Sequence, residues 1–484
     1  MKSDNIIDIY SFISDIYSDF FVTKTYWFWF VNIYIWVVNL FIMIYDLMSK
    51  FFDTLNRIWS NDSLKKKIMF TLLMILLYRL LVYIPVPFVN IDNLNAARFG
   101  SSGLQYFAML LGGSFDRFSI IAVWLTPYIN ASIITQLLAN IIPSWEELSN
   151  EWEAGQKKIQ QYTRYITFPL AILQSIGMTY LINSQFGGNI IDVTQFFPNV
   201  MGTAIVLSFG SILLMWMAEL ITEKWIGNGT SMIIFANIVS GIVTNLYSSI
   251  IWADNKFILF IAVFILILML IILAVFIIKT VKEIPVLYSR QGKVQQTSTL
   301  PFPLNPVGMV PIIFAIAFVS FPYLATQILI KFGTNHARVE WLASWIEKNF
   351  NFYNTNHSRQ LTLSYFLLIV FFTFFYTLIQ FNPEKIADNI QSRWWFIPSV
   401  RPGKETVNYI NKILMHLCLR GGSILWFLGI YSTLLNYIPA LHDIMSKLWS
   451  IPIAITGSGI IIIVWVVQDI MNKINSELVM TKYN

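Results

Sequence analysis

The sequence predicts an all-α polytopic membrane protein. Of its 484 residues, 56% are hydrophobic and only 12% are charged, about half the charged share of a soluble globular protein, which is roughly 25%. Uncharged stretches of about 20 residues, the length that a helix needs to cross the hydrocarbon core, recur along the chain. Two clear examples are residues 257 to 278 and 309 to 330. These observations favour membrane-crossing helices over the strands of a barrel.

Residues 1–63 form an N-terminal extension with a hydrophobic helix predicted at 25–45. The first 24 residues are polar and acidic, whereas 25–45 is aromatic and long enough to span. No small-residue cleavage site follows it, so we do not expect an ordinary signal peptide. A helix lying in the membrane interface is the alternative, and the length favours a span. A spanning helix would place the N-terminus outside, beside the first core helix.

Ten further spans follow, beginning in the cytoplasm after the triplet Lys65 to Lys67. The connections assigned to the cytoplasm carry about twice as many Lys and Arg residues as the outer ones, as the positive-inside rule requires. The predicted spans lie at about 68–87, 119–142, 165–184, 200–219, 230–251, 257–279, 309–331, 361–381, 419–437 and 451–471.

Two cytoplasmic connections, 280–305 and 382–418, are long and basic, and residues 473–484 form a short cytoplasmic tail. Proline and glycine in both connections predict structured turns that project from the bilayer. Such loops could dock a large partner.

No pattern for catalysis, cofactor binding or metal binding is found. Cys418 is the only cysteine, the four histidines have no metal-ligand spacing, and there is no phosphate-binding loop or nucleophile elbow. We therefore expect no catalytic residues, no metal and no cofactor. A secondary transporter is the alternative function, but it predicts charged groups along a path, and the spans have almost none apart from Arg79 and, near a boundary, Glu219.

The second predicted span carries an unusual number of polar side chains. They include Tyr128, Asn130, Gln136 and Asn140 within an uncharged run from Phe118 to Trp145. Hydrocarbon tolerates such groups only where protein or water meets them. This helix is therefore expected to face a wet interior.

Several ordered stretches resemble the SecY family, the channel-forming subunit of the bacterial and plastid Sec protein translocase. The resemblance covers roughly residues 64 to 475. It is carried by LTPYINASIITQLL (125–138), EAGQKKIQQYTRY (153–165), LAILQSIG (170–177), WMAELITEKWIGNGTSMIIFANIVSG (216–241), STLPFPLNPVGMVPIIFA (298–315), FNPEKIADNI (381–390) and FIPSVRPGKET (396–406).

The resemblance implies a ten-helix core in two pseudo-symmetric halves, 64–252 with helices one to five and 253–472 with helices six to ten. Unfolded secretory proteins would cross between the halves, and transmembrane segments would leave sideways into the lipid of the cytoplasmic membrane. The implied partners are SecE-like and SecG-like small subunits, the motor SecA or the ribosome or both, signal peptides and unfolded preproteins.

The resemblance also implies a pore ring, which falls on Leu125, Ile129, Ile234, Ile313 and Ile462. A narrow aliphatic collar expels water and offers ions no replacement for their hydration shell, so it can close a pore by dewetting. Without the resemblance, each residue would be ordinary packing in a membrane helix.

A plug is implied at about 103–117, with Phe107, Gly112, Gly113 and Arg117. This segment is too short to cross the membrane, and two glycines break it. Backbone that re-enters the membrane is allowed only inside protein or beside water. An outer interfacial helix is the alternative.

Polar gate positions of the family fall on Gln136 and Gln174, and Asn305 lies at the start of the opposing helix. A few interhelical hydrogen bonds of roughly 0.6 to 2 kcal/mol each can hold a seam shut in lipid. Structural bonding between fixed helices is an equal alternative. Two departures from the family pattern, Thr299 and Pro303, stand near this gate.

Partner docking is implied at Arg401, with Arg290, Lys293 and Lys404 adding positive charge to the two cytoplasmic loops. If the partner is the ribosome, these groups would meet RNA phosphate through charge, without reading its sequence. A purely topological role for the basic residues is the alternative.

Overall fold

The computed structural model divides the chain into two compact units, Met1–Met69 and Phe70–Asn484. It describes residue 56 and residues 59–90, 118–151, 153–185, 190–193, 195–225, 227–252, 256–288, 297–305, 307–318, 322, 326, 341–342, 344–346, 359–393, 395–436 and 457–480. The predicted helix 25–45 therefore lies outside the described residues.

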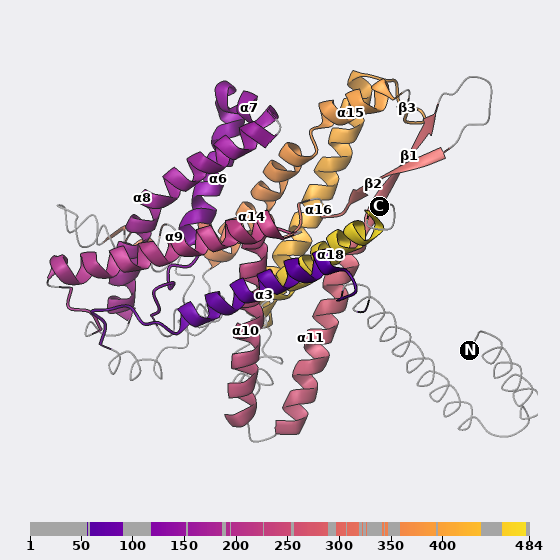
Figure 1. Ribbon diagram of the computed structural model, residues 1–484. Coiled ribbons are helices and arrows are strands. Elements are labelled where there is room, and N and C mark those ends of the chain that lie inside the picture. Colours follow the sequence, from indigo (N-terminus) through magenta and orange to yellow (C-terminus); the bar gives the residue numbers. More distant parts are fainter. Residues whose placement is uncertain are drawn as a thin grey trace, which may run out of the picture. The chain divides into compact units, whose positions relative to one another are not determined.

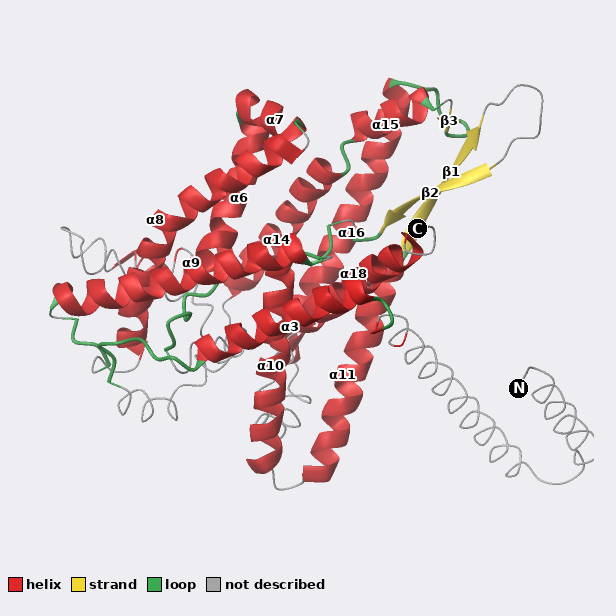
Figure 2. Cartoon of the chain, viewed as in Figure 1, coloured by secondary structure: helices red, strands yellow, loops and turns green. Residues whose placement is uncertain are grey.

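Helices make up most of the described chain (Figures 1 and 2). In a helix the backbone N–H and C=O groups form hydrogen bonds within the same segment, as the water-free interior of a membrane requires. A further short helix occupies 310–318. The helices are α3 (Asp62–Val82), α6 (Thr126–Ile141), α7 (Pro143–Asn150), α8 (Glu153–Gln185), η1 (Phe196–Val200), α9 (Met201–Lys224), α10 (Gly229–Trp252), α11 (Lys256–Lys279), α14 (Arg359–Gln380), α15 (Pro383–Ser392), α16 (Lys404–Asn436) and α18 (Gly457–Met480).

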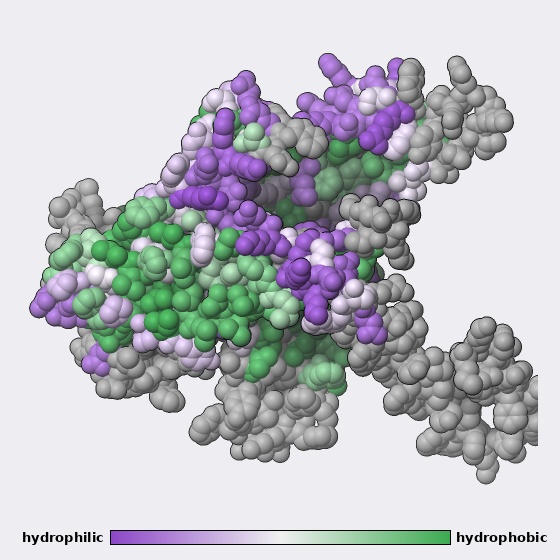
Figure 3. Space-filling view, in the orientation of Figure 1, coloured by the Kyte–Doolittle hydropathy of each residue, from purple (hydrophilic) through white to green (hydrophobic). Residues whose placement is uncertain are grey.

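Two helices extend well beyond the predicted spans. α8 and α16 each have 33 residues, and their first turns lie in segments predicted as cytoplasmic loops. Glu, Gln, Lys and Arg are good helix formers, so a hydrophilic sequence continues the helix out of the membrane. In Figure 3, hydrophilic side chains gather where α7 and α15 lie.

The second span differs from its prediction at its start. We expected helix from residue 119, but α6 begins at Thr126, and residues 118–125 form turns. Pro127 stands in the first turn of α6, where its missing N–H costs nothing. Phe118 and Trp124 have positive φ angles of 42° and 57°, which a continuous helix does not permit.

The two connections predicted to be cytoplasmic, 280–305 and 382–418, share a small three-stranded sheet with the order β2-β1-β3. β1 (Val281–Tyr288) pairs antiparallel with β2 (Thr297–Pro303), matching Val281 with Pro303 and Leu287 with Thr297. It also pairs with β3 (Trp395–Phe396). The fold is therefore mostly helical and not purely so. A separate apolar core joins the sheet to α15 and α16, with Ile284, Phe302, Ala387, Ile390, Ile397, Ile410, Leu414 and Leu417 buried.

Three helices among the described residues are long and apolar enough to cross a membrane: Ala154–Asn183, Phe196–Lys224 and Leu363–Ser392. Shorter apolar helices lie at Gly229–Val243 and Ile267–Lys279. Each of these five ranges overlaps one of the predicted spans. Large aliphatic side chains remain exposed on such helices, for example Ile205 on α9 and Ile272 on α11, as expected where lipid replaces water.

Candidate functional site: an aliphatic constriction

The candidate site is a cluster of aliphatic side chains from four separate elements. Leu125, Ile129, Ile234 and Ile462 are buried in the main hydrophobic core, and Ile313 is half-buried and packs against it. Leu125 and Ile129 stand at the start of α6, Ile234 on α10, Ile313 on the helix at 310–318 and Ile462 on α18. All five predicted ring residues therefore belong to the main hydrophobic core or pack against it.

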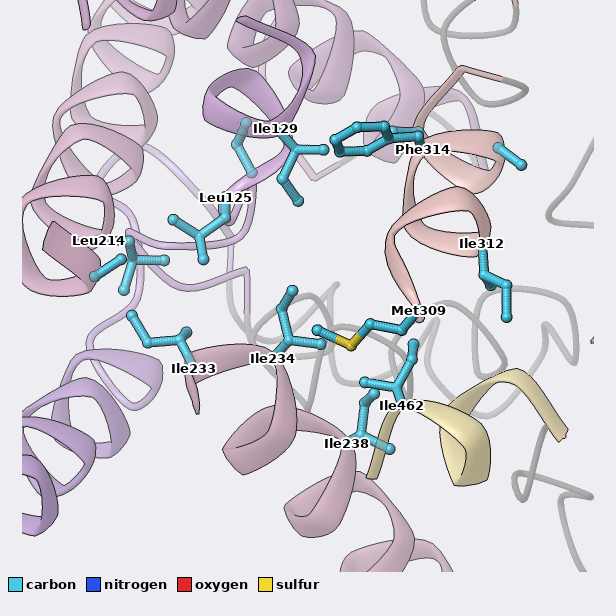
Figure 4. Packing of buried hydrophobic residues seen from close by; sticks show 14 of the residues in the cluster. Leu125, Ile129, Leu214, Ile233, Ile234, Ile238, Met309, Ile312, Phe314 and Ile462 are labelled. Atoms are coloured by element: carbon cyan, nitrogen blue, oxygen red, sulfur yellow. The ribbon is translucent and has the colours of Figure 1, made fainter. Parts of the chain in front are cut away.

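Helical spacing aligns the side chains within two of these elements. The N–H of Ile129 donates to the carbonyl of Leu125 at 2.9 Å, so this pair lies one turn apart on one face of α6. Ile234 and Ile238 repeat that spacing on α10. In the view of Figure 4, Ile234, Ile238 and Ile462 lie around the Met309 side chain, whereas Ile233 lies toward Leu214.

A cavity of about 700 Å³ adjoins this cluster. Ile129, Ile234 and Ile313 form part of its apolar wall together with Val307, Met309, Val310 and Phe314. The rest of the wall is mainly polar or aromatic, with Tyr128, Ser132, Gln136, Gln160, Glu219, Thr222, Trp225, Gly227, Asn228, Thr230, Ser231, Tyr376, Gln380, Trp465 and Lys473. A wettable cavity thus meets a patch of aliphatic side chains.

The two charged side chains in the cavity wall are both paired. Arg164 Nε donates to Glu219 Oε1 at 2.9 Å, and Gln160 Nε2 donates to the same oxygen at 3.3 Å. Lys473 Nζ lies 2.7 Å from Asp469 Oδ2, one turn away on α18. The contacts of Glu219 join α8 to α9, and with the Lys473–Asp469 pair each charge in the wall has an opposite charge beside it.

Arg79, which looked costly inside the first span, is bound to α10. Its Nη2 donates to the carbonyl of Ala236 at 2.9 Å. The hydroxyl of the adjacent Tyr78 donates to Asn237 Oδ1, and both of these side chains are fully buried. Sequence analysis named Arg79 but missed Tyr78 and Asn237. Their signal was a polar pair inside two apolar spans.

The three predicted gate residues have different surroundings. Gln136 lines the cavity and donates through Nε2 to Ser132 Oγ at 2.9 Å. Asn305 Nδ2 donates to the carbonyl of Gly308 at 2.8 Å. Gln174 is buried on α8, and among the residues that the structure describes neither amide atom has a hydrogen-bond partner. The side-chain nitrogen atoms of Gln136 and Asn305 thus each donate a hydrogen bond to a residue three or four positions away in the sequence.

Comparison with known proteins agrees with this geometry. The SecY family model matches residues 119–471. The chain is 36% identical to the protein translocase subunit SecY of Halalkalibacterium halodurans over 452 residues, which cover 89% of this chain and 98% of the relative. It is also 36% identical to SecY of Bacillus subtilis over 439 residues, covering 87% and 96%.

This chain belongs to the SecY family. It is a protein-conducting channel of Sec translocation, a multi-pass membrane protein and not an enzyme, so the alternative of a small-solute transporter is set aside.

Solved structures show the same fold. "The structure of a protein conducting channel" matches with a TM-score of 0.56 at 17% identity, covering 86% of this chain and 92% of that one. The Sec61 chain of a canine ribosome-channel complex from the endoplasmic reticulum matches with a TM-score of 0.55 at 15% identity, covering 85% and 92%.

The remaining site residues predicted from the SecY resemblance fall into two groups. Arg401 and Lys404 are exposed at the turn that leads into α16, where Thr406 Oγ1 donates to the Arg401 carbonyl at 2.9 Å. The others lie outside the described residues: the plug at 103–117 with Phe107, Gly112, Gly113 and Arg117, and the loop residues Arg290 and Lys293.

Proposed function

We propose that Leu125, Ile129, Ile234, Ile313 and Ile462 form the constriction that closes the idle channel and through which unfolded polypeptides cross. The observation that carries this proposal is the meeting of aliphatic side chains from four elements beside a cavity whose wall also carries polar side chains. Water and polypeptide enter the wettable cavity, but ions lose their hydration at the aliphatic end. Because these side chains are flexible and uncharged, they also yield to polypeptides of any sequence.

The test compares two neighbouring isoleucines on α10. Ile234 lines the cavity, whereas Ile233 packs beside Leu214, and both are buried. Truncation to alanine at either position costs roughly 2 to 5 kcal/mol of stability, so the two variants are matched in that respect. Only Ile234→Ala widens the proposed constriction.

The measurement is ion leak through the resting channel in proteoliposomes, normalised to the amount of inserted protein. We expect Ile234→Ala to leak more than both the unchanged channel and Ile233→Ala. Equal leak from the two variants would show that general loosening, and not a seal at Ile234, controls conductance.

Around this constriction, we infer a ten-helix core in two pseudo-symmetric halves, 64–252 and 253–472. The segment 103–117 would close the outer side as a plug. Gln136, Gln174 and Asn305 would border the seam through which transmembrane segments leave for the lipid. The unsatisfied amide of Gln174 supports this placement, because a buried polar group without a partner weakens its helix contact. The helix 25–45 would be an eleventh span.

We further infer that the cytoplasmic loops dock the motor SecA or the ribosome. Arg401 and Lys404 would carry the contact, and Arg290 and Lys293 would extend it. This docking proposal is supported by the packing of the loops, because the sheet and its apolar core tie loop 280–305 to α15 and α16. SecE-like and SecG-like subunits would cover exposed apolar helix faces, as expected for a translocase subunit.

A charge reversal tests the docking surface. Arg401→Glu is compared with Lys158→Glu, because Lys158 is an exposed basic residue on α8, away from the sheet. We expect only Arg401→Glu to weaken binding of SecA or ribosomes to membranes that contain the channel. Binding that is unchanged by Arg401→Glu would remove this residue from the docking surface.

A further inference from the structure

The non-helical segment 118–125 carries Leu125 into the constriction. It is tied at its beginning, where Val86 N donates to the carbonyl of Phe118 and Ile120 N donates to the carbonyl of Ile84, both at 3.0 Å. Two short turns follow, closed by Ala122 N to Ser119 O at 2.8 Å and by Trp124 N to Ile121 O at 2.9 Å. Trp124, the residue before Leu125, has a φ of 57°, which is unusual for a residue with a side chain.

Helix α9 meets this segment at two consecutive residues. A Cβ atom added to Gly210 would collide with the carbonyl oxygen of Ile120 and lie 2.6 Å from its carbon. The backbone at Ile120 therefore packs directly on the bare helix backbone. One residue later, Ser211 Oγ donates to the carbonyl of Trp124 at 2.7 Å. The Ser211 side chain is fully buried.

We propose that Gly210 and Ser211 are positioning residues that hold Leu125 in the constriction of the resting channel. This inference rests on the proposed function of the constriction. Gly210 admits the middle of the segment close to α9, and Ser211 fixes the peptide group that immediately precedes Leu125. An unfavourable φ such as that of Trp124 persists only when surrounding contacts impose it, and the Ser211 hydrogen bond is such a contact.

Loss of the Ser211 hydroxyl has a specific consequence. It leaves the Trp124 carbonyl without this donor in a partly buried place, and an acceptor that has lost its partner there favours any rearrangement that brings water to it. Because Leu125 is the next residue, that rearrangement moves an aliphatic side chain of the seal. The expected result is a leaky resting channel that still folds.

Ser208 provides a matched control on the same helix, about one turn away. It is also buried, its hydroxyl donates to Ala204 O at 2.7 Å, and Ser175 Oγ lies within hydrogen-bond distance of its oxygen at 3.1 Å. These contacts join α9 to α8 and do not involve segment 118–125. Ser208→Ala therefore removes a buried hydroxyl of the same kind without touching the seal.

The experiment measures resting ion leak in proteoliposomes for Ser211→Ala, Ser208→Ala and Ile234→Ala, each in the full channel complex and normalised to inserted protein. A hydrogen bond within a membrane protein corresponds to a factor of about three to ten in an equilibrium, so we expect a leak increase of that size for Ser211→Ala. Ser208→Ala should stay at the level of the unchanged channel. Gly210→Ala should leak at least as much as Ser211→Ala. If the Gly210→Ala channel does not accumulate in the membrane, the comparison of Ser211→Ala with Ser208→Ala tests the inference.

The outcomes separate this inference from the function on which it rests. A tight Ser211→Ala channel beside a leaky Ile234→Ala channel would overturn the positioning role and keep the constriction. Tight channels for both would overturn the constriction itself. Equal leak from the two serine variants would overturn the inference, because it would assign the leak to loosening of α9.

Discussion

Gly308 offers the sharpest test of how the helix at 310–318 is held against α18. Gly308 has a φ of 69°, and a Cβ atom added there would collide with the indole nitrogen of Trp465 and lie 2.9 Å from its Cζ2. Met309 and Ile313 come shortly after Gly308 in the sequence, and Ile462 lies about one helical turn before Trp465. The glycine therefore sets the approach of two walls of the constriction.

The cost of Gly308→Ala has two parts that can be separated. A side chain in the left-handed backbone region costs about 1 to 2 kcal/mol, and overpacking a close contact costs typically about 1 to 3 kcal/mol. Gly403 supplies the control for the first part, since its φ is 96° and no atom lies within 4 Å of an added Cβ. We therefore expect about 2 to 5 kcal/mol for Gly308→Ala and only about 1 to 2 kcal/mol for Gly403→Ala.

Trp465→Leu completes the experiment, because it removes the indole that the new methyl group would strike. The assay is the free energy of unfolding in detergent, measured for each single variant and for both double variants. Gly308→Ala should cost less in the Trp465→Leu background, whereas the cost of Gly403→Ala should not change. Equal costs for the two glycine variants, or additive effects of Gly308→Ala and Trp465→Leu, would refute the close approach.

Two further predictions concern polar contacts. Tyr78→Phe removes the hydroxyl group that donates to Asn237, so we expect the free energy of unfolding to fall by about 0.6 to 2 kcal/mol in the same assay. This cost of Tyr78→Phe should be smaller in the Asn237→Leu background than in the unchanged protein. A larger cost of Tyr78→Phe in that background would contradict the pairing. Asn382 accepts the N–H groups of Glu384 and Lys385 at 3.0 and 3.3 Å, so Asn382→Ala should weaken the start of α15 by about 0.5 to 2 kcal/mol. Faster proteolysis within α15 at unchanged resting leak would support this, and an unchanged cleavage rate would count against it.

The apolar spans were the most predictable part of the fold. α10 and α11 lie within one residue of the predicted limits 230–251 and 257–279. Length and absence of charge decide whether a segment crosses a bilayer, and both properties are local. The same rule finds only the apolar half of α8, because hydropathy does not register the hydrophilic turns from Glu153 onward.

Segment 118–125 shows what the sequence could not reveal. Its residues are as apolar as a helix in lipid, and nothing local distinguishes the two conformations. Contacts with Gly210 and Ser211, almost 90 residues away in sequence, accompany the non-helical backbone. The strand pair in loop 280–305 is similar, since β1 is also paired with β3, more than 100 residues later for Leu287 and Phe396.

The residues of the proposed constriction were identified through resemblance, not through their own composition. Ile234 is 3% exposed at the cluster and Ile272 is 61% exposed on α11, yet both are isoleucines in uncharged stretches of a helix. Only the arrangement of the helices separates them. Paired polar residues gave a better local signal, because Arg79 inside a span already required an internal partner.

The most direct test of the central claim is photocrosslinking from single positions to a secretory chain stalled during translocation. Probes replace Ile129, Ile234 or Ile313 at the constriction, and Ile205 or Ile272 on exposed helix faces serves as the control. The account predicts crosslinks to the stalled chain from the three constriction positions and none from the two exposed ones. Crosslinks from the exposed positions alone would contradict it.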